Sequence, residues 1–523
     1  MTAPISDVLT TAEGGNLAGI FQRWVGTDRI VYYDLTHGDI ETPNVVTYDE
    51  FAGRCGRLAG GLLARGLRPG QRVAILADNS VDYGVAYMGI AWAGMATVPL
   101  NTRQPAATLA WVAEDAELAL VFFDDANADR VPAGVPAIRI GSDEWAAMIA
   151  AEPVPIASVD GGDVAVQMYT SGSTGRPKGV LLTHGGQLFS IDQYLNGVMP
   201  MDPDERLLIS APMYHKNAAM QTKMALGLGG SIVLLERFDV EDSLRAVDRH
   251  RVTAMTGVPT MFSLMFRRHD LLDELDRSSV RRLSIGSAPM TQALFDQGRA
   301  LFPNATITNG YGTTEVVAVF GGHPDGLARP DITVGYPLAA IESRLVDPAT
   351  GEDASVGELW IRSPGNMAGY HNLPEVTATR MADGWYRTGD VMEADENGWH
   401  FFVGRVDDMF TCAGENVYPG DVEQMLEQSP LVFQSSVVPV ADELKGSLPV
   451  AFVVPAPGVE AGDETAAAIK HWSLQNGPAY QHPRAVWFVD ELQLAGTNKI
   501  DRASLTAEAE RRWADDPARL ARD

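Results

Sequence analysis

Residues 169–180 read Tyr169-Thr170-Ser171-Gly172-Ser173-Thr174-Gly175-Arg176-Pro177-Lys178-Gly179-Val180, and an apolar run over residues 164–168 comes directly before them. The apolar run predicts a short buried strand, and the polar stretch predicts a loop after it. Glycines allow positive φ angles and close backbone approach, while hydroxyls, successive N–H groups and a lysine can surround an anion. We interpret the stretch as a phosphate-binding loop.

The spacing of this loop separates it from two other phosphate-binding patterns. In the P-loop a glycine precedes the lysine and a Ser or Thr follows it, whereas here Pro177 precedes Lys178 and Gly179 follows it. A dinucleotide fingerprint is excluded as well, because no G-x-G-x-x-G opens a helix here. The remaining alternative is a flexible surface loop of Gly and Ser, which the direct continuation into the apolar residues 180–182 disfavours.

The composition is that of an ordinary globular protein. The 523 residues include 46% hydrophobic and 21% charged residues, so a large core can form. A net charge of −28 argues against a nucleic-acid partner, whose binding surface would be basic. The two cysteines, Cys55 and Cys412, are far apart and predict neither a disulfide framework nor a metal cluster, which favours a cytoplasmic location. The sequence predicts no signal peptide and no membrane span.

The chain alternates between helix-like and strand-like segments. Thr47 and Glu50 form a predicted capping box, and apolar residues then recur at helical spacing until Gly66. Strands are expected near residues 72–76, 118–123, 231–235, 252–255 and 282–285, with helices at 81–94, 240–250 and 259–267. This alternation predicts parallel α/β layers.

The pattern of predicted secondary structure changes after about residue 340. Strand-like runs near residues 344–347, 357–362 and 399–403 predict a smaller β-rich subdomain. A domain boundary is expected near residues 404–408, and the last section of the chain then alternates between helix and strand again.

Four further stretches carry residues suited to nucleotide chemistry. Asn309-Gly310-Tyr311-Gly312-Thr313-Thr314-Glu315 holds a ring between glycines, where it can stack on a base, and ends in a carboxylate suited to Mg²⁺. In Tyr386-Arg387-Thr388-Gly389-Asp390 the acid can accept hydrogen bonds from ribose hydroxyls. Residues 404–423 contain Arg405 and a glycine turn, and Lys499 stands alone near the C-terminus. Taken singly, each has a plainer interpretation as a turn, a buried tyrosine or a surface charge.

Together these stretches resemble the superfamily of adenylate-forming enzymes, which contains acyl- and aryl-CoA synthetases, firefly luciferase and the adenylation domains of peptide synthetases. The resemblance runs from about Thr47 to Arg502, with the motifs in the family's order. Pro99-Leu100-Asn101-Thr102-Arg103 and the undivided length make the chain most similar to a free-standing acyl-CoA synthetase.

The resemblance implies a two-domain α/β fold. A large N-terminal domain of layered α/β subdomains plus a β-rich subdomain would occupy residues 1–404. Residues 405–408 would form a hinge, and residues 409–523 a small mobile C-terminal α+β domain.

The resemblance also implies roles for single positions. ATP would contact the loop, the adenine and ribose positions and the final lysine, that is Thr170, Ser171, Gly172, Ser173, Thr174, Gly175, Lys178, Ser287, Ala288, Pro289, Asn309, Gly310, Tyr311, Gly312, Thr313, Thr314, Asp390, Arg405 and Lys499. The catalytic positions would be Lys499, Thr314, Glu315, His215 and Lys178, with Glu315 holding Mg²⁺. Coenzyme A would lie near Ala413, Gly414 and Glu415, and Asp407 matches the hinge residue.

The implied reaction is ATP-dependent ligation of a carboxylic acid to coenzyme A. The carboxylate attacks the α-phosphate, an acyl-adenylate forms with release of pyrophosphate, and a thiol then displaces AMP. Lys499 and Mg²⁺ can neutralise the approaching anions, and the C-terminal domain would swing between the two half-reactions. The chain departs from the pattern at Asn498, where the family commonly has glycine. Plant hydroxycinnamate ligases tend to have lysines where Asp407 and Ala413 stand here.

The sequence leaves the substrate open between fatty and aromatic acids. The expected acyl pocket comprises His215, Lys216, Asn217, Met261, Gly286, Thr313 and Val316. Lys216 and Asn217 are polar where many fatty-acid enzymes carry apolar residues, which suits an acid with a hydroxyl or a second acidic group, unless Lys216 points to solvent. A carrier-protein or amine acceptor in place of coenzyme A, a nucleotide-binding sensor without turnover, and a homodimer also stay open.

Overall fold

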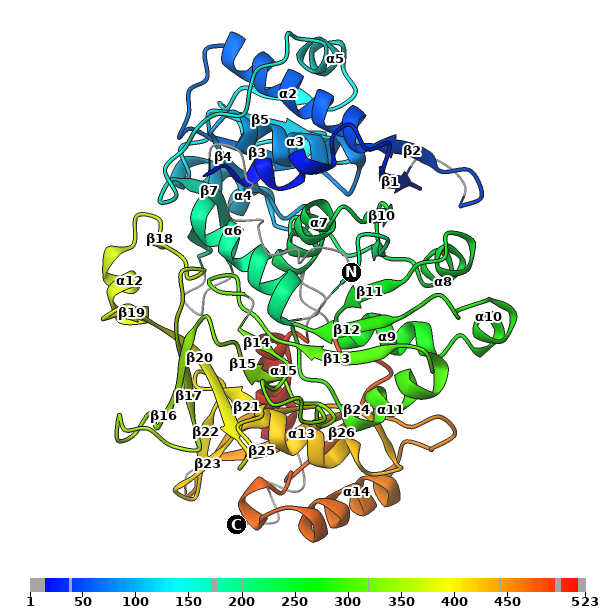
Figure 1. The fold of residues 1–523 in the computed structure, drawn as a ribbon. Helices are drawn as coiled ribbons and strands as arrows, with labels where there is room; N and C mark the ends of the chain where they lie inside the picture. The colour runs from blue at the N-terminus through cyan, green and yellow to red at the C-terminus, as the bar shows by residue number, and fades with distance from the viewer. Residues whose placement is uncertain are drawn as a thin grey trace.

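The computed structural model of the protein describes residues 15–36, 40–170, 176–198, 201–317, 319–442, 444–493 and 500–515. Two sheets with their helices form the upper and middle parts of the molecule in Figure 1, a β-rich region lies below them, and the last hundred or so residues form the bottom. Among the described helices, none is both long enough and apolar enough to span a membrane.

The first sheet holds the strand that precedes the phosphate-binding loop. Its strands, in spatial order, are β18 (Gly369–Tyr370), β8 (Lys178–Thr183), β7 (Val164–Thr170), β4 (Ala96–Pro99), β3 (Arg72–Leu76), β5 (Leu120–Phe123) and β6 (Ala137–Arg139). The strands from β7 to β6 run parallel, whereas β7–β8 and β8–β18 are antiparallel pairs. The elements associated with this sheet are η2 (Leu17–Trp24), α2 (Tyr48–Ala64), α3 (Val81–Trp92), α4 (Ala106–Asp115), η3 (Asp125–Arg130) and α5 (Asp143–Ile149).

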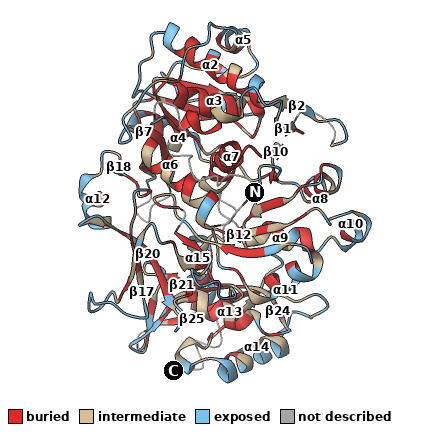
Figure 2. Ribbon diagram, viewed as in Figure 1, coloured by how far each residue is buried: buried red, intermediate tan, exposed pale blue. Residues whose placement is uncertain are grey.

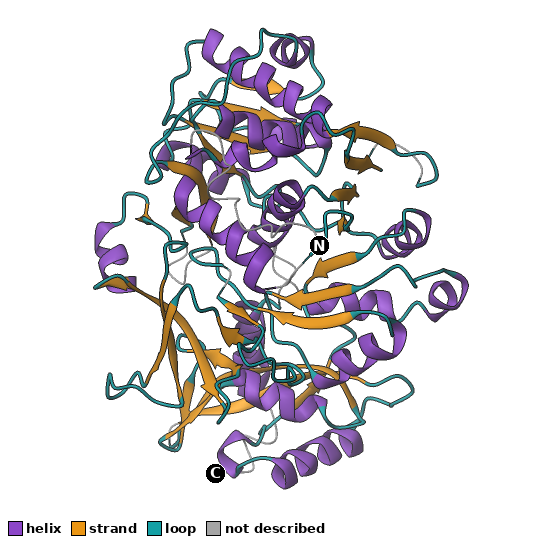
Figure 3. Ribbon diagram, in the orientation of Figure 1, coloured by secondary structure: helices purple, strands orange, loops and turns teal. Residues whose placement is uncertain are grey.

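The second sheet is mainly parallel, and the motifs predicted for the adenine site lie at the ends of one edge strand and of the strand next to it. Its order is β13 (Thr306–Gly310), β12 (Arg282–Gly286), β11 (Ala254–Gly257), β9 (Arg206–Ile209), β10 (Ser231–Leu234), β1 (Ile30–Asp34) and β2 (Asn44–Thr47). Its helices are α8 (Val240–Arg249), α9 (Pro259–Phe266), α10 (His269–Glu274) and α11 (Gln292–Leu301). Between the two sheets lie α6 (His184–Gln193), the π-helical turn η4 (Tyr194–Val198) and α7 (Lys216–Leu228), as Figure 3 shows.

The β-rich region is an antiparallel sheet with a short hairpin beside it. The sheet contains β16 (Glu342–Val346), β17 (Val356–Arg362), β20 (Trp385–Ala394), β19 (Met381–Ala382) and β21 (His400–Arg405), and the separate pair is β14 (Phe320–Gly321) with β15 (Tyr336–Pro337). The helix α12 (Pro374–Arg380) links it back towards the first sheet.

The C-terminal region has its own sheet and its own core. The elements are β22 (Phe410–Cys412), β23 (Glu415–Val417), α13 (Pro419–Glu427), β24 (Val432–Asp442), β25 (Gly446–Pro455), α14 (Asp463–Asn476), η5 (Ala479–Gln481), β26 (Val486–Phe488) and α15 (Arg502–Asp515). Its buried apolar residues, from Phe410 to Trp513, form a hydrophobic cluster separate from the one that joins the two large sheets. Figure 2 shows the buried residues concentrated in the sheets and in α3, α6 and α7, while α14 is largely exposed.

The layered α/β architecture predicted from the sequence is confirmed, with small differences in element bounds. The expected strand at residues 252–255 begins two residues later, at Ala254. Arg251 adopts a left-handed φ of 48°, and the Val252 N–H bonds to the carbonyl of Val247, so Val252 closes the end of α8 instead of pairing in the sheet. The strand expected from residue 118 likewise begins at Leu120.

Candidate active site

The phosphate-binding loop connects two paired strands. Thr170 at the end of β7 lies opposite Lys178 at the start of β8, so the hairpin holds both ends of the loop. The predicted residues Ser171, Gly172, Ser173, Thr174 and Gly175, and also Lys499, lie outside the described residues.

Asp390 is the centre of a buried polar cluster on the β-rich sheet. Asp390 is only 4% exposed. In the register of β20 and β21 it lies opposite Arg405. One carboxylate oxygen accepts a hydrogen bond from the Arg405 guanidinium at 2.6 Å, and the other accepts one from the Tyr311 hydroxyl at 2.6 Å. Burial, and then the Asp390 charge, raise the pKa of Tyr311 well above its usual value. Asp390, Arg405 and Tyr311, which were predicted from three separate stretches of sequence, thus meet in one cluster.

Glu315 lies beside the base of the phosphate-binding hairpin. Its Oε1 accepts a hydrogen bond from the Tyr370 hydroxyl at 2.8 Å, and its backbone carbonyl accepts one from the Met367 N–H. Tyr370 belongs to β18, which pairs with β8, and the Lys178 ammonium lies 5.6 Å from the centre of its ring. Tyr370 therefore connects Glu315 to the strand that carries Lys178.

The ends of β12 and β13 approach each other closely where the adenine site was predicted. A Cβ added at Gly286 would lie 2.2 Å from the carbonyl oxygen of Gly310, so only glycine fits. Ser287 follows with a left-handed φ of 65°, which turns the chain away from the sheet before Ala288 and Pro289. The Asn309 side chain donates to the carbonyl of Ile332 at 2.7 Å.

A cavity opens next to these strand ends. Its empty volume is about 350 Å³, and its lining includes Asn309, Gly310, Tyr311, Phe320 and Arg329. The adjoining loop of Gly312, Thr313 and Thr314 is closed by a hydrogen bond from the Val316 N–H to the Thr313 hydroxyl at 3.2 Å.

The start of α7 carries three of the predicted acyl-pocket residues, with His215 at the N-cap and Lys216 and Asn217 in the first turn. The side chain of Asn79 accepts a hydrogen bond from the Met213 N–H at 2.7 Å, and the ring of His215 lies edge-on to Tyr214 with centroids 4.5 Å apart. Asn217 accepts a hydrogen bond from the Thr256 hydroxyl at 3.1 Å. Lys216 is half-buried, and burial lowers the pKa of its ammonium to about 8, so it is not an ordinary solvated surface charge.

The remaining predicted pocket residues lie on neighbouring elements of the second sheet. Met261 of α9 is 4% exposed and packs against Gly257 at the end of β11. Val316 is 1% exposed and belongs to the large hydrophobic cluster.

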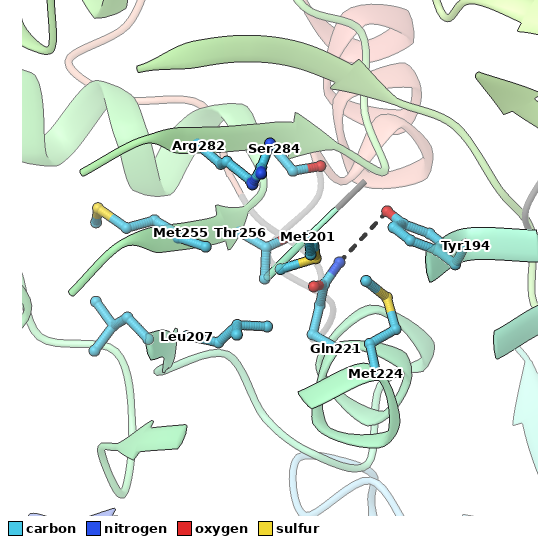
Figure 4. A pocket seen from close by; sticks show the side chains of 11 residues that line it. Tyr194, Met201, Leu207, Gln221, Met224, Met255, Thr256, Arg282 and Ser284 are labelled. Atoms are coloured by element: carbon cyan, nitrogen blue, oxygen red, sulfur yellow. Dashed lines mark hydrogen bonds between the residues drawn. The ribbon is translucent and has the colours of Figure 1, made fainter. Parts of the chain in front are cut away.

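A second cavity, of about 330 Å³, extends along α7 (Figure 4). None of the predicted acyl-pocket residues lines it. Its lining residues are Tyr194, Met201, Leu207, Leu208, Gln221, Met224, Ala254, Met255, Thr256, Arg282 and Ser284. The Gln221 amide donates to the Tyr194 hydroxyl at 3.4 Å across this space. Gln221 is a polar residue in the buried part of α7, and such a position is the kind of sequence signal that could have pointed to this cavity.

The segment that follows β21 contains the predicted hinge and coenzyme A positions. Asp407 is exposed and accepts a hydrogen bond from the Arg380 guanidinium at 3.2 Å. Ala413 and Gly414, with φ of 55° and 89°, form an exposed two-residue turn between β22 and Glu415 of β23.

Sequence reasoning missed the tyrosines that surround Glu315. Tyr370 was not singled out, and Tyr386 was quoted within a motif without a role. Burial, and then the Glu315 charge, raise the pKa of both hydroxyls. An isolated tyrosine in a Gly-Tyr pair carries no periodic signal, and its contact with Glu315 spans 55 residues.

The donor set around Glu315 suits Mg²⁺ shared with phosphates better than a dedicated metal cage. Among the described residues, no group of three or more His, Cys, Asp or Glu side chains is placed to hold a metal ion. Mg²⁺ in nucleotide sites is bound through one or two carboxylates together with substrate phosphates and waters. Glu315 supplies one such carboxylate near the phosphate-binding hairpin.

Comparison with known proteins identifies the family that the chain matches. A family model described as an AMP-binding enzyme matches residues 22–371, and one described as an AMP-binding enzyme C-terminal domain matches residues 421–499. The chain is 36% identical over 481 residues to a feruloyl-CoA synthase of Amycolatopsis sp, covering 90% of this chain and 94% of the relative. It is 32% identical over 476 residues to 4-coumarate–CoA ligase 5 of Oryza sativa subsp. japonica, covering 86% of this chain and 87% of the relative.

Among solved structures, ATP-bound MatB from Rhodopseudomonas palustris superimposes with a TM-score of 0.87 at 27% identity, covering 95% of this chain and 99% of that one. The apo form of the same protein superimposes with a TM-score of 0.79 over the same shares. The protein as a whole is therefore more similar to the ATP-bound form than to the apo form.

Proposed function

The chain belongs to the AMP-binding enzyme family, and we propose that within it the protein activates a hydroxylated aryl acid of the cinnamate type. It is an acid–CoA ligase that acts through an acyl-adenylate, releases AMP and pyrophosphate, and uses ATP, Mg²⁺ and coenzyme A. The observation that carries the aryl preference is the 36% identity to a feruloyl-CoA synthase over nearly the whole chain. The acyl groups named in that relative and in the coumarate ligase are both hydroxylated cinnamates.

For the nucleotide, we propose that Asp390 accepts hydrogen bonds from the ribose hydroxyls and that Tyr311 stacks on adenine. The buried position of Asp390 between Arg405 and Tyr311 supports this role, because a carboxylate held by two donors is fixed in orientation. The cavity lined by Asn309, Gly310 and Tyr311 supports the adenine assignment.

For the phosphates, we propose that Thr170, Lys178 and the loop between them hold the triphosphate and that Thr314 contacts it. Glu315 would hold Mg²⁺, which when bound supplies positive charge against the phosphate oxygens. The paired ends of the loop and the contact of Tyr370 with Glu315 support an arrangement organised before ATP arrives. Such preorganisation is the main source of electrostatic catalysis.

For the acid, we propose that it enters beside His215, Lys216 and Asn217 with its carboxylate towards the phosphates. Lys499 would then bridge the carboxylate and the α-phosphate in the first half-reaction. The cavity along α7 supports an acyl group that is mainly apolar, because Met224, Met255 and Leu207 give it an apolar lining with a few polar groups.

For the domains, we propose boundaries at residues 1–404 and 409–523 with Asp407 as the hinge residue. The separate hydrophobic cluster that begins at Phe410 supports this division. The better superposition on the ATP-bound than on the apo form of MatB supports a movable C-terminal domain, with this arrangement belonging to the nucleotide-bound half of the cycle. Coenzyme A would contact the exposed turn of Ala413, Gly414 and Glu415 after the C-terminal domain has moved.

We also propose a cytoplasmic location and a homodimer, and no nucleic-acid partner. The two cysteines are free and buried, which is compatible with a reducing compartment, and the net charge is −28. Light scattering coupled to size-exclusion chromatography measures the oligomeric state directly.

The function is tested by product analysis with a panel of acids. The protein is incubated with ATP, Mg²⁺ and coenzyme A, and with one acid at a time from ferulate, 4-coumarate, cinnamate, benzoate, octanoate and malonate. We expect hydroxycinnamoyl-CoA, AMP and pyrophosphate in equal amounts, with the hydroxycinnamates preferred. Preference for octanoate or malonate would contradict the aryl assignment, and pyrophosphate release without any thioester would indicate a carrier-protein or amine acceptor.

A further inference from the structure

The C-terminal end of α4 bonds to residues of, or next to, both strands that flank β8. The side chain of Asp115, the last residue of α4, accepts a hydrogen bond from the Tyr169 hydroxyl of β7 at 2.5 Å. Its backbone carbonyl accepts one at 2.9 Å from Nε2 of His371, the residue that directly follows β18. One residue of a helix thus connects two segments that carry parts of the proposed phosphate site.

The stability of α4 does not account for a carboxylate at this position. The C-terminus of a helix carries partial negative charge, so an aspartate there is unfavourable for the helix itself. Burial, and then the contact with Asp115, raise the pKa of Tyr169, so that its hydroxyl is protonated at neutral pH and can donate to the carboxylate. The contacts that Asp115 makes with other elements therefore account for its place at the end of α4.

Tyr169 is also held from its other side. Its hydroxyl accepts a hydrogen bond from the Gln167 amide at 2.8 Å, and the Gln167 side-chain oxygen accepts one from Nε of Arg72 on β3 at 3.0 Å. The ring stands edge-on to that of Trp111 on α4, with centroids 6.0 Å apart. A continuous chain of hydrogen bonds thus runs from β3 to the end of α4 and fixes the Tyr169 hydroxyl.

These side chains meet over Gly179, the residue next to Lys178. Gly179 is the register partner of Tyr169. A Cβ added there would lie 2.9 Å from the Gln167 amide nitrogen, 3.1 Å from the Tyr169 ring and 3.2 Å from the Cβ of His371. The backbone N–H of His371 donates to the Gly179 carbonyl at 2.7 Å. The backbone beside Lys178 is therefore enclosed by the groups that the end of α4 holds.

The contact with His371 extends to the proposed metal site. His371 directly follows Tyr370, whose hydroxyl donates to Glu315 at 2.8 Å. The Lys178 ammonium lies 5.6 Å from the centre of the Tyr370 ring. The two groups that the proposed function gives to the phosphates and to Mg²⁺, Lys178 and Glu315, are therefore both connected to the end of α4.

We infer that Asp115 is a positioning residue for the binding of Mg²⁺·ATP, because through Tyr169 and His371 it keeps the segments of Lys178 and of the Tyr370–Glu315 pair in fixed relative positions before the nucleotide binds. This inference rests on the proposed function and adds to it a residue that acts only through its neighbours. Groups that are already in place bind a ligand more tightly than groups that must be ordered on binding.

The test compares the affinities for Mg²⁺·ATP and for AMP, both measured by calorimetry. AMP lacks the β- and γ-phosphates and their metal ion, so it reports on the rest of the nucleotide site. We expect Tyr169→Phe and Asp115→Ala to raise the Kd for Mg²⁺·ATP about tenfold, as for partial loss of a charged hydrogen bond, and to leave the Kd for AMP within about twofold of the parent. The double variant is expected to bind Mg²⁺·ATP no more weakly than the weaker single variant, because the two residues form one contact.

Three further variants separate positioning from stability. Asp115→Asn keeps an acceptor oxygen for the Tyr169 hydroxyl and is expected to retain most of the affinity for Mg²⁺·ATP. Tyr48→Phe removes a hydroxyl that bonds to two backbone carbonyls in another part of the protein, and Glu114→Ala removes the exposed neighbour of Asp115. Both are expected to bind the two nucleotides as the parent does. Thermal unfolding is measured for every variant, and Tyr169→Phe, which loses a single oxygen atom, decides the test if Asp115→Ala does not fold.

Three results would overturn the inference. The first is parental affinity for Mg²⁺·ATP in Tyr169→Phe and Asp115→Ala. The second is an equal loss of affinity for Mg²⁺·ATP and AMP, and the third is a loss of the same size in Tyr48→Phe, since both would indicate a general effect on the fold. If the parent binds neither nucleotide, the proposed function fails and the inference fails with it. If the parent and its variants bind Mg²⁺·ATP equally well, the inference alone is refuted.

Discussion

At the scale of single residues, the site depends on carboxylates whose orientation is fixed by neighbours from distant parts of the chain. Asp390 and Glu315 each accept a hydrogen bond from a tyrosine hydroxyl, from Tyr311 and Tyr370 respectively. Both tyrosines are protonated at neutral pH, since the usual pKa of tyrosine is about 10 and burial raises it further here, so each hydroxyl acts as a donor.

Tyr370→Phe tests the second of these pairs. Loss of the hydroxyl leaves Glu315 free to rotate, and a charged hydrogen bond of this kind is worth about 1.5–3 kcal/mol. We expect the Mg²⁺ concentration for half-maximal activity to rise by about tenfold, while kcat at saturating Mg²⁺ changes much less. Direct Mg²⁺·ATP binding by calorimetry provides a second readout.

Tyr336→Phe is the matched control, since the Tyr336 ring packs against His323 and Trp399 and no described residue bonds to its hydroxyl. An unaltered Mg²⁺ dependence in Tyr370→Phe would show that the hydroxyl does not position Glu315.

At the scale of elements, the proposed adenine site depends on two strands that lie very close together. Gly286 of β12 and Gly310 of β13 are register partners, and no side chain fits between them. The positive φ of Ser287 follows at once, so the chain leaves the sheet where the base is proposed to bind.

Gly286→Ala is expected to force β12 and β13 apart, because the new methyl group would lie 2.2 Å from a backbone oxygen. Overpacking of this kind costs about 1–3 kcal/mol of stability, and we expect a lower Tm and weaker ATP binding. Gly322→Ala serves as control, because nothing lies within 4 Å of its added Cβ. Equal Tm values for the parent and Gly286→Ala would contradict the close approach.

Most of the regular elements were predictable from the sequence. The capping box of Thr47 and Glu50 begins α2 as expected, and Gly66 follows its end with a φ of 86°. The apolar runs that predicted β3, β7 and β12 are also strands in the structure. Local patterns were sufficient here because caps, helical spacing and apolar runs act over a few residues.

Two-residue strands and long-range contacts were not predictable in this way. The pairing of β18 with β8 brings Tyr370 alongside Val180, although 190 positions separate them, and no periodic signal marks so short a strand. The cavity along α7 was missed for the same reason, since Tyr194, Gln221 and Ser284 meet only in the folded chain. The motifs indicated which chemistry to expect, and tertiary packing determined which side chains support it.

At the scale of the whole molecule, the proposed cycle requires the C-terminal region to change its position about Asp407. The N–H groups of Val406, Asp408 and Met409 bond to backbone carbonyls, whereas that of Asp407 has no acceptor among the described residues. Proline restricts φ to about −65° and needs no acceptor for an N–H.

Asp407→Pro is therefore expected to leave acyl-adenylate formation within about threefold of the parent and to slow thioester formation by more than about tenfold. Asp407→Ala loses the contact with Arg380 but keeps a free φ, so it should support both steps. Equal impairment of both half-reactions in Asp407→Pro would contradict the hinge.

Where α13 of the C-terminal region meets the β-rich sheet, neighbouring carboxylates repel one another. Burial, together with the charges of Glu393 on β20 and of Glu423, raises the pKa of Asp421 on α13 to about 7. The folded protein thus holds this proton more tightly than the unfolded chain, so its contribution to stability falls as pH rises from about 4 to about 7.

Asp421→Asn removes the carboxylate, and with it the loss of stability that the parent shows as pH rises. We expect the variant to have a higher Tm than the parent near pH 8, about half that advantage near pH 5.5 and little advantage near pH 4, measured by thermal unfolding at matched ionic strength. Glu510→Gln, an exposed position on α15, should show no such pH dependence. A Tm difference for Asp421→Asn that is constant across this range would contradict the raised pKa.

The central claim is that the chain makes an acyl-adenylate at the site around Asp390 and Glu315 and passes the acyl group to coenzyme A. The most direct measurement is mass spectrometry of a single turnover with ATP, Mg²⁺ and 4-coumarate, quenched before and after coenzyme A is added. The account predicts coumaroyl-AMP bound to the protein before the addition, and coumaroyl-CoA with free AMP after it. Coumaroyl-CoA formed with ADP and phosphate, or an adenylate that coenzyme A does not consume, would contradict it.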